Sequence, residues 1–130
     1  MTDDTFPIEA LSVSGNRTIG PYSDAVKASN LAFLSGRIGL NYANMELVEG
    51  GIGEQTRQCL VNIAEVLEMA GSSLRNVIKS TVFLTDMADF AAMNAVYGEA
   101  FADRKPARST VAVAGLPMGA LVEIEVIAAL

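Results

Sequence analysis

The chain has 130 residues, of which 51% are hydrophobic and 18% are charged, a composition typical of one globular domain with a sizeable core. Its net charge of −6 has the wrong sign for attraction to nucleic-acid phosphates or to anionic lipid, so neither nucleic acid nor a membrane is expected as the main partner. Because the sequence contains no histidine, histidine-based zinc sites and Ser-His or Cys-His triads are excluded.

The N-terminal stretch, MTDDTFPIEA, bears on where the protein resides. It carries acidic residues where a secretory signal would carry basic residues followed by an apolar run. No apolar stretch of the chain approaches the roughly 20 residues that a membrane span requires. The single cysteine, Cys59, cannot form an intramolecular disulfide, which fits a reducing compartment. We therefore expect a cytoplasmic protein.

The first half of the chain predicts a β-hairpin followed by a helix. Residues 24–40, DAVKASNLAFLSGRIGL, hold two β-rich runs around Ala28-Ser29-Asn30, the pattern of a hairpin. Residues 53–71, GEQTRQCLVNIAEVLEMAG, repeat apolar side chains at helical spacing, and Gly71 stands where a helix would be capped. The apolar stripe comprises Cys59, Leu60, Ile63, Val66, Leu67 and Ala70, and the opposite face is expected to carry Gln58, Asn62, Glu65 and Glu68. We therefore expect Cys59 to be a small core side chain and not a reactive thiol.

The next part of the chain predicts a strand and a second helix. The strand is expected in residues 77–86, VIKSTVFLTD, where apolar Ile78, Val82 and Leu84 alternate with Lys79, Thr81 and Thr85. Asp86 or Asp89 can cap a helix that continues through residue 104, with Phe90, Met93, Tyr97 and Phe101 on its apolar face. Asn94 falls on the same apolar stripe, and a polar amide in that position needs a hydrogen-bond partner.

The C-terminal part predicts two more strands, in ARSTVAVAG and ALVEIEVIAAL, joined by a turn at residues 116–119. In the last strand, Val122, Ile124, Val126 and Ala128 point one way, and Glu123, Glu125, Ile127 and Ala129 the other. The order of elements predicts a single α+β domain over residues 1–130, with both helices on one face of a mixed or antiparallel sheet. Because apolar side chains on the other face also need cover, we expect self-association.

Arg108 stands out because it opens an apolar strand in the stretch KPARSTVAVAGLP. Burial of an unpaired guanidinium is destabilising, on the order of several kcal/mol. The pattern alone leaves two explanations open. Arg108 forms a cross-strand ion pair with a glutamate of the neighbouring strand, Glu123 or Glu125, or it binds an anion from outside the chain.

The stretch PARSTVAVAGLPMGALVEIEV resembles the signature of the Rid/YjgF family of reactive-imine deaminases, formerly called the L-PSP endoribonuclease family. The segments GPYSDAV, LAFLSGRIGL, EQTRQCLVNIAEVLEMAG, VIKSTVFLTDMADFAAMNAVY and EIEVIAAL resemble the family's blocks in the same order, over nearly the whole chain after Ile19. The resemblance implies a chorismate-mutase-like α+β fold, a mixed sheet with two helices on one face, that assembles as a homotrimer with clefts between subunits. It also implies a hydrolase that converts 2-imino acids or their enamines, such as 2-iminobutanoate and 2-iminopropanoate, to 2-keto acids and ammonia without a metal or an organic cofactor.

The same resemblance implies roles for individual residues. Arg108 would grip the substrate carboxylate with its planar fork. Glu123 would hold and orient the attacking water as a general base, with help from the backbone carbonyl of Thr110. The remaining positions would shape the pocket and hydrogen-bond the substrate: Tyr22, Ser35, Gly36 and Asn94.

Alternatives remain open for residues and for function. Tyr22 could instead be a core or interface aromatic, Ser35 a turn hydroxyl, and Asn94 the partner of a loop carbonyl. The chain departs from the family pattern at Thr110, where many members have cysteine, at Arg37, where glutamine is frequent, and in a shortened loop before Pro106. A second cation near the cleft is therefore expected at Arg37. The rival functions are a non-catalytic module that binds small carboxylate metabolites, a ribonuclease and a purely structural trimer.

Overall fold

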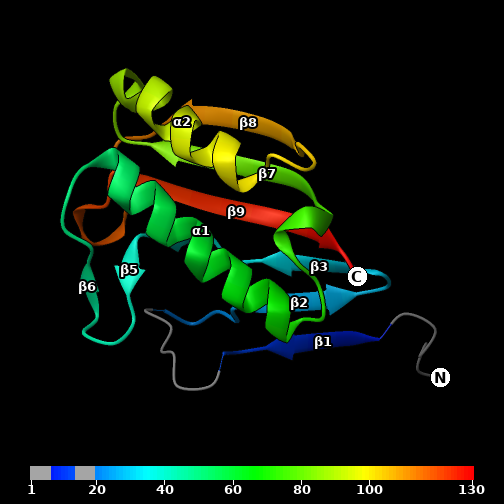
Figure 1. The fold of residues 1–130 in the computed structure, drawn as a ribbon. Helices are drawn as coiled ribbons and strands as arrows, with labels where there is room; N and C mark the ends of the chain where they lie inside the picture. The colour runs from blue at the N-terminus through cyan, green and yellow to red at the C-terminus, as the bar shows by residue number, and fades with distance from the viewer. Residues whose placement is uncertain (1–6, 14–19) are drawn as a thin grey trace.

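Figure 1 shows the chain in a computed structural model, which describes residues 7–13 and 20–130. The main sheet has the strand order β1-β2-β3-β9-β7-β8, and the short strand β4 also pairs with β9. The strands of this sheet are β1 (Ile8–Leu11), β2 (Ala25–Ala28), β3 (Leu31–Leu34), β4 (Arg37–Ile38), β7 (Val77–Leu84), β8 (Ala107–Ala112) and β9 (Val122–Ala129). The remaining elements are a two-stranded ribbon of β5 (Leu40–Asn41) and β6 (Glu46–Leu47), helices α1 (Ile52–Met69) and α2 (Phe90–Ala100), and 3-10 turns at Leu74–Asn76, Met87–Asp89 and Pro117–Gly119. Residues 1–6, which include the acidic Asp3 and Asp4 that contributed to the prediction of a cytoplasmic protein, lie outside the described residues.

Both helices lie on one face of the sheet, so the predicted α+β layout is confirmed (Figure 1). The sheet is mixed, because β7 and β8 pair in parallel while the other described pairs are antiparallel. The predicted hairpin is confirmed as well, since β2 and β3 pair across the turn at Ser29 and Asn30. None of the described helices is long and apolar enough to cross a membrane.

Helix α1 confirms the predicted apolar stripe, all six residues of which are buried. It ends at Met69, and Gly71, two residues later, has a φ of 86°, the left-handed conformation that glycine favours after a helix. The prediction that Asn62 lies on the exposed face is wrong, because Asn62 is only 7% exposed. Its amide donates to the carbonyls of Ile38 and Leu40 at 3.1 and 2.8 Å, so α1 holds in place the segment that runs from β4 to β5.

Strand β7 departs from the simple alternation that its sequence predicts. Ile78 was expected to face the core but is 45% exposed, because the register against β9 shifts between Val77 and Lys79. Val77 takes the buried position instead, and the predicted inward direction of Val82 and Leu84 is confirmed further along the strand.

Helix α2 confirms the second predicted helix with a different start and end. Asp86 caps the preceding 3-10 turn by accepting a hydrogen bond from the backbone N–H of Ala88 at 2.9 Å. The helix ends at Ala100 and not at residue 104. Phe101 nevertheless remains buried against the core, at 2% exposure.

Arg108 and Glu123 lie on opposite faces of the sheet. Strand β7 separates β8 from β9, with Ser80 beside Arg108 and Phe83 beside Glu123. Ser80 is a buried residue of the face under the helices, and Phe83 points the other way because it lies an odd number of positions further along β7. The prediction that Arg108 and Glu123 lie on neighbouring strands is therefore wrong, and so is the explanation of Arg108 as the cross-strand partner of Glu123 or Glu125.

The face of the sheet without helices carries apolar side chains that are open to solvent in the single chain. Phe33 on β3 and Val111 on β8 are 43% and 42% exposed, and Ile127 on β9 is half-buried beside Phe33. Self-association through this face remains a prediction.

Candidate active site

Four of the predicted site residues line one cavity of about 350 Å3 on the face without helices: Tyr22, Ser35, Gly36 and Glu123. The other residues around it are Arg37, Ile38, Leu40, Tyr42, Pro117 and Glu125. The wall of this cavity thus combines a carboxylate and hydroxyl groups with apolar side chains, which is the usual makeup of a small-molecule site.

The segment between β3 and β4 brings Ser35 and Gly36 to this cavity. The Ser35 N–H donates to the carbonyl of Asp24 at 3.0 Å, and the Ser35 hydroxyl donates to the carbonyl of Ser23 at 2.6 Å. Gly36 packs directly against Glu123, and a Cβ at this position would overlap the Glu123 carboxylate. Glycine here lets the Glu123 carboxylate approach the backbone closely, and a larger residue would displace that carboxylate. The Ser35 hydroxyl also serves the predicted alternative of holding a turn.

The carboxyl of Glu123 has a raised pKa. Half-burial raises the pKa of its carboxyl above the usual glutamate value, and the nearby charge of Glu125 raises this pKa further. A carboxylate with a raised pKa accepts a proton more readily near neutral pH than an ordinary glutamate does. The geometry and the pKa therefore suit Glu123 to hold and deprotonate a water molecule.

Arg108, Asn94 and Thr110 belong to a second cluster, on the face under α2. The Arg108 guanidinium carbon lies 4.7 Å from the ring centroid of Tyr97 and 5.6 Å from that of Phe90. These distances are those of cation–π contacts. Such contacts hold the guanidinium through its charge and leave the N–H donors in the plane of the guanidinium available for hydrogen bonds. No carboxylate of the described residues lies within ion-pair distance of Arg108.

Two further polar atoms of this cluster are buried without a hydrogen-bond partner among the described residues. They are the side-chain carbonyl oxygen of Asn94 and the hydroxyl oxygen of Thr110. An unsatisfied buried polar group costs about 1–3 kcal/mol, so such groups normally mark a missing partner. The side-chain carbonyl of Asn94 therefore has no donor in the described part of the chain, and the alternative that the Asn94 amide serves a loop carbonyl stays a prediction.

Five residues that line the cavity were not predicted as site residues from the sequence: Ile38, Leu40, Tyr42, Pro117 and Glu125. Arg37, expected near the cleft as a second cation, does line the cavity, but its Nη2 lies 2.8 Å from Oδ1 of Asp24. Tyr42 also lines the cavity, and its hydroxyl accepts a hydrogen bond from Nη1 of Arg37. The sequence did contain a signal for the pairing of Asp24 with Arg37. Each of these charged residues stands at the edge of an apolar β-run, Asp24 before AVKA and Arg37 before IGL, and buried charges are normally paired.

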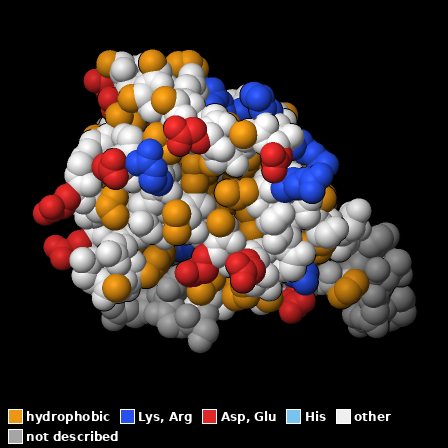
Figure 2. All heavy atoms as spheres, in the orientation of Figure 1, with side chains coloured by type: hydrophobic (Ala, Val, Ile, Leu, Met, Phe, Trp, Pro, Cys, Tyr) orange, Lys and Arg blue, Asp and Glu red, His pale blue; other side chains and the backbone are white. Residues whose placement is uncertain are grey.

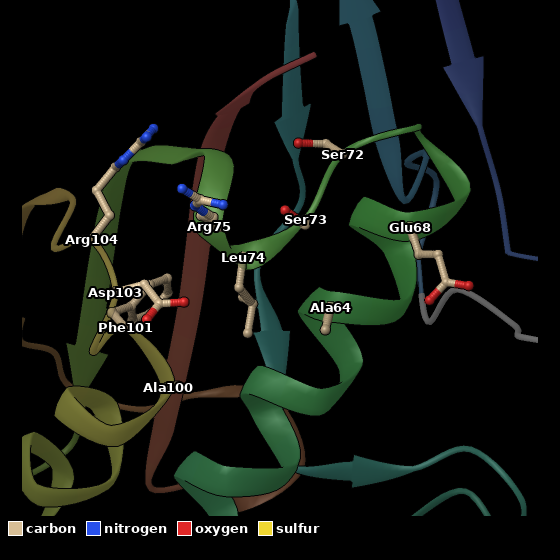
Figure 3. Close-up of a pocket in the computed structure, with 10 residues that line it drawn as sticks. All are labelled: Ala64, Glu68, Ser72, Ser73, Leu74, Arg75, Ala100, Phe101, Asp103 and Arg104. Atoms are coloured by element: carbon tan, nitrogen blue, oxygen red, sulfur yellow. The ribbon is translucent and has the colours of Figure 1, made fainter.

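A larger hollow, of about 460 Å3, lies at the C-terminal ends of α1 and α2 and contains none of the predicted site residues (Figure 3). Its charged side chains are all exposed, and Figure 3 shows Glu68 on the opposite side of the hollow from Arg75 and Arg104. Figure 2, which looks onto the helices, shows acidic and basic side chains scattered among apolar ones over this face. The arrangement lacks the convergent polar groups found around Glu123 and Arg108.

Residues 14–130 match the family described as Endoribonuclease L-PSP. The chain belongs to this family. A RutC family protein of Pyrococcus horikoshii is 54% identical over 112 residues, which cover 86% of this chain and 89% of that protein. A goat (Capra hircus) protein named 2-iminobutanoate/2-iminopropanoate deaminase is 47% identical over 110 residues, covering 85% of this chain and 80% of its own. The crystal structure of E. coli TdcF with bound serine superimposes with a TM-score of 0.87 at 35% identity and covers 94% of this chain and 99% of its own.

The family includes proteins of several compartments. Relatives 52% and 46% identical to this chain are named as mitochondrial in fission yeast and as chloroplastic in Arabidopsis thaliana. The location of this protein in the cytoplasm stays a prediction.

Proposed function

We propose that the protein hydrolyses 2-imino acids to 2-keto acids and ammonia. Water adds to the imine carbon, the carbon–nitrogen bond breaks, and nitrogen leaves as ammonia, so that one imino acid and one water give one keto acid and one ammonia. Names of relatives such as the goat 2-iminobutanoate/2-iminopropanoate deaminase support this reaction. The observation that carries the proposal is Arg108, a half-buried guanidinium held by two aromatic rings and without a carboxylate partner among the described residues.

Each polar group has a place in this reaction. Arg108 binds the substrate carboxylate through two parallel hydrogen bonds, for which its planar fork is suited. Glu123 orients the water and takes its proton, and the carbonyl of Thr110 helps to hold that water. Because an iminium carbon is already electrophilic, positioning and one general base suffice for the chemistry. The remaining predicted residues border the substrate: Tyr22, Ser35, Gly36 and Asn94.

We also infer that a complete site requires two subunits, in a homotrimer with one cleft between each pair. In one chain, Arg108, Asn94 and Thr110 belong to the face under α2, whereas Glu123 and its cavity belong to the opposite face. A substrate of a few carbon atoms cannot reach both clusters across the sheet. A neighbouring copy that brings its Arg108 to this Glu123 would unite the clusters, and the exposed Phe33 and Val111 supply apolar surface for such packing.

The test couples an L-threonine dehydratase, which releases the imine, to semicarbazide, which traps the imine that escapes hydrolysis. Wild-type protein should lower the rate of semicarbazone formation. Arg108→Ala should lose the effect, because removing a charge-assisted contact costs roughly 2–5 kcal/mol, or about 30-fold and more in kcat/KM. Arg104→Ala is the matched control, since it removes an exposed arginine that lines the hollow at the helix ends and not the cavity of Glu123, and it should behave as wild type.

The outcomes separate the rival functions. Near-normal turnover by Arg108→Ala would refute the role of Arg108. Saturable binding of a 2-keto acid without any imine hydrolysis by the wild type would instead indicate a binding module for small carboxylates. Cleavage of RNA that is lost in Arg108→Ala would indicate a ribonuclease, against which the net charge of −6 argues.

A further inference from the structure

A buried ion pair stands directly behind the cavity that contains Glu123. Arg37 and Asp24 have side chains only 4% and 2% exposed, and Nη2 of Arg37 lies 2.8 Å from Oδ1 of Asp24. The second carboxylate oxygen of Asp24 accepts a hydrogen bond from the backbone N–H of Val13 at 2.7 Å. Buried ion pairs contribute little to stability compared with apolar residues of the same size, so this pair calls for another explanation.

The pair extends to a third residue, Tyr42. Nη1 of Arg37 donates a hydrogen bond to the Tyr42 hydroxyl, and the guanidinium carbon lies 5.4 Å from the centroid of the Tyr42 ring. Asp24 thus fixes Arg37, and the planar fork of Arg37 fixes Tyr42, an arrangement that the single point charge of lysine cannot reproduce. Tyr42 lies on the connection from β5 to β6, where the side chains of Asn41 and Asn44 accept hydrogen bonds from the backbone N–H groups of Ala43 and Glu46 and so hold the backbone but not the Tyr42 ring.

Tyr42 borders the part of the cavity that is left for a substrate side chain. A 2-imino acid has a carboxylate, an imine carbon and a side chain. In the function proposed above, the first two groups are taken by Arg108 and Glu123. Beyond Glu123 and the segment 35–37, the cavity wall consists of Glu125 and of the apolar or aromatic side chains of Tyr22, Ile38, Leu40, Tyr42 and Pro117. Ile38 and Leu40 are buried in the protein, so the rings of Tyr22, Tyr42 and Pro117 form the accessible apolar wall, and Tyr42 is joined to the buried ion pair through Arg37.

We propose that Asp24, Arg37 and Tyr42 act as one unit that sets the length of side chain accepted by the site, with Arg37 as a positioning residue for the Tyr42 ring. This inference rests on the proposed imine hydrolysis. A ring held in place limits the room for long side chains and favours imino acids derived from alanine over those derived from leucine. Discrimination of this kind, by apolar contact in a pocket, is worth about 10- to 200-fold between side chains that differ in length.

The experiment compares the imines of alanine and leucine, both generated by one L-amino-acid oxidase and trapped with semicarbazide. The quantity measured is the ratio of kcat/KM for the leucine imine to that for the alanine imine. Tyr42→Ala should raise this ratio about 10-fold or more, and Arg37→Lys should raise it in the same direction although Tyr42 is intact. Leu47→Ala is the matched control, because Leu47 packs in the same apolar cluster as Tyr42 but does not line the cavity, and the ratio should not change.

The double variant Arg37→Lys/Tyr42→Ala decides whether Arg37 acts through Tyr42. If it does, the ratio should equal that of Tyr42→Ala alone, because contacting residues that form one unit are not additive. An unchanged ratio in Tyr42→Ala, or full additivity in the double variant, would overturn the inference while turnover by the wild type upholds the proposed function. A wild type that hydrolyses neither imine would overturn the proposed function itself, and this inference with it.

Discussion

Mixing two inactive variants tests whether the candidate site is shared between subunits. Arg108→Ala lacks the group that we propose binds the carboxylate, and Glu123→Gln lacks the proposed general base. Each variant alone should therefore lose turnover, by about 30-fold or more for Arg108→Ala. The two residues lie on opposite faces of one sheet, separated by β7. A complete site can then form only where Glu123 of an Arg108→Ala subunit meets Arg108 of a Glu123→Gln subunit.

The recovery expected from such a mixture follows from counting clefts. In a closed ring of randomly mixed subunits at equal amounts, a cleft has an intact Glu123 in about half of the cases and an intact Arg108 in about half, so about one quarter of the clefts are complete. The two variants are unfolded and refolded together, and the semicarbazone assay is compared with that of each variant refolded alone. Turnover near one quarter of the wild-type value is expected. Turnover no higher than that of the separate variants, in a mixture that light scattering shows to be fully assembled, would mean that the argument from the two faces is wrong.

Three further predictions concern charge and burial. As the proposed general base, Glu123 would act only when deprotonated, and burial and Glu125 both raise its pKa. We therefore expect kcat/KM to fall with decreasing pH before an ordinary glutamate would titrate. Glu125→Gln should move this fall to lower pH, and an unmoved profile would exclude Glu125 as a cause. Asp24→Asn leaves the buried charge of Arg37 uncompensated, so urea denaturation should show a loss of about 3–5 kcal/mol in the free energy of unfolding, and a loss below about 1 kcal/mol would mean that the pair is solvated. Burial raises the pKa of the Cys59 thiol, so iodoacetamide should label it only after unfolding, and labelling of the native protein would contradict its position in the core.

Local patterns in the sequence were sufficient to predict most of the elements. Helix α1 could be predicted because its apolar spacing extends over about three turns, from Cys59 to Ala70, and because Gly71 follows directly. Strand β9 could be predicted because Val122, Ile124 and Val126 alternate with glutamates, and the structure buries those three side chains. In both elements the local preference and the packing of the whole domain agree.

Long-range properties could not be predicted in the same way. The relation of Arg108 to Glu123 depends on the insertion of β7 between β8 and β9, and no local pattern encodes that order of strands. Asn62 has the polarity of an exposed residue, and only its contacts with the carbonyls of Ile38 and Leu40 explain its burial. Ile78 departs from the predicted alternation because the register against β9 shifts between Val77 and Lys79.

The polar groups that the described part of the chain leaves unsatisfied give the proposed two-subunit site a thermodynamic rationale. Under α2, Arg108 lacks an anionic partner, and the buried oxygens of Asn94 and Thr110 lack donors, among the described residues. On the other face, half-burial raises the pKa of Glu123, so its charged form is disfavoured there. The unpaired groups under α2 and the half-buried carboxyl of Glu123 are each unfavourable in the single chain. A substrate carboxylate at Arg108 and a water molecule between the two clusters would supply partners to both clusters. Substrate binding would thereby release free energy that the fold keeps stored in the unliganded chain, and that free energy would be available to position the imine carbon against the water.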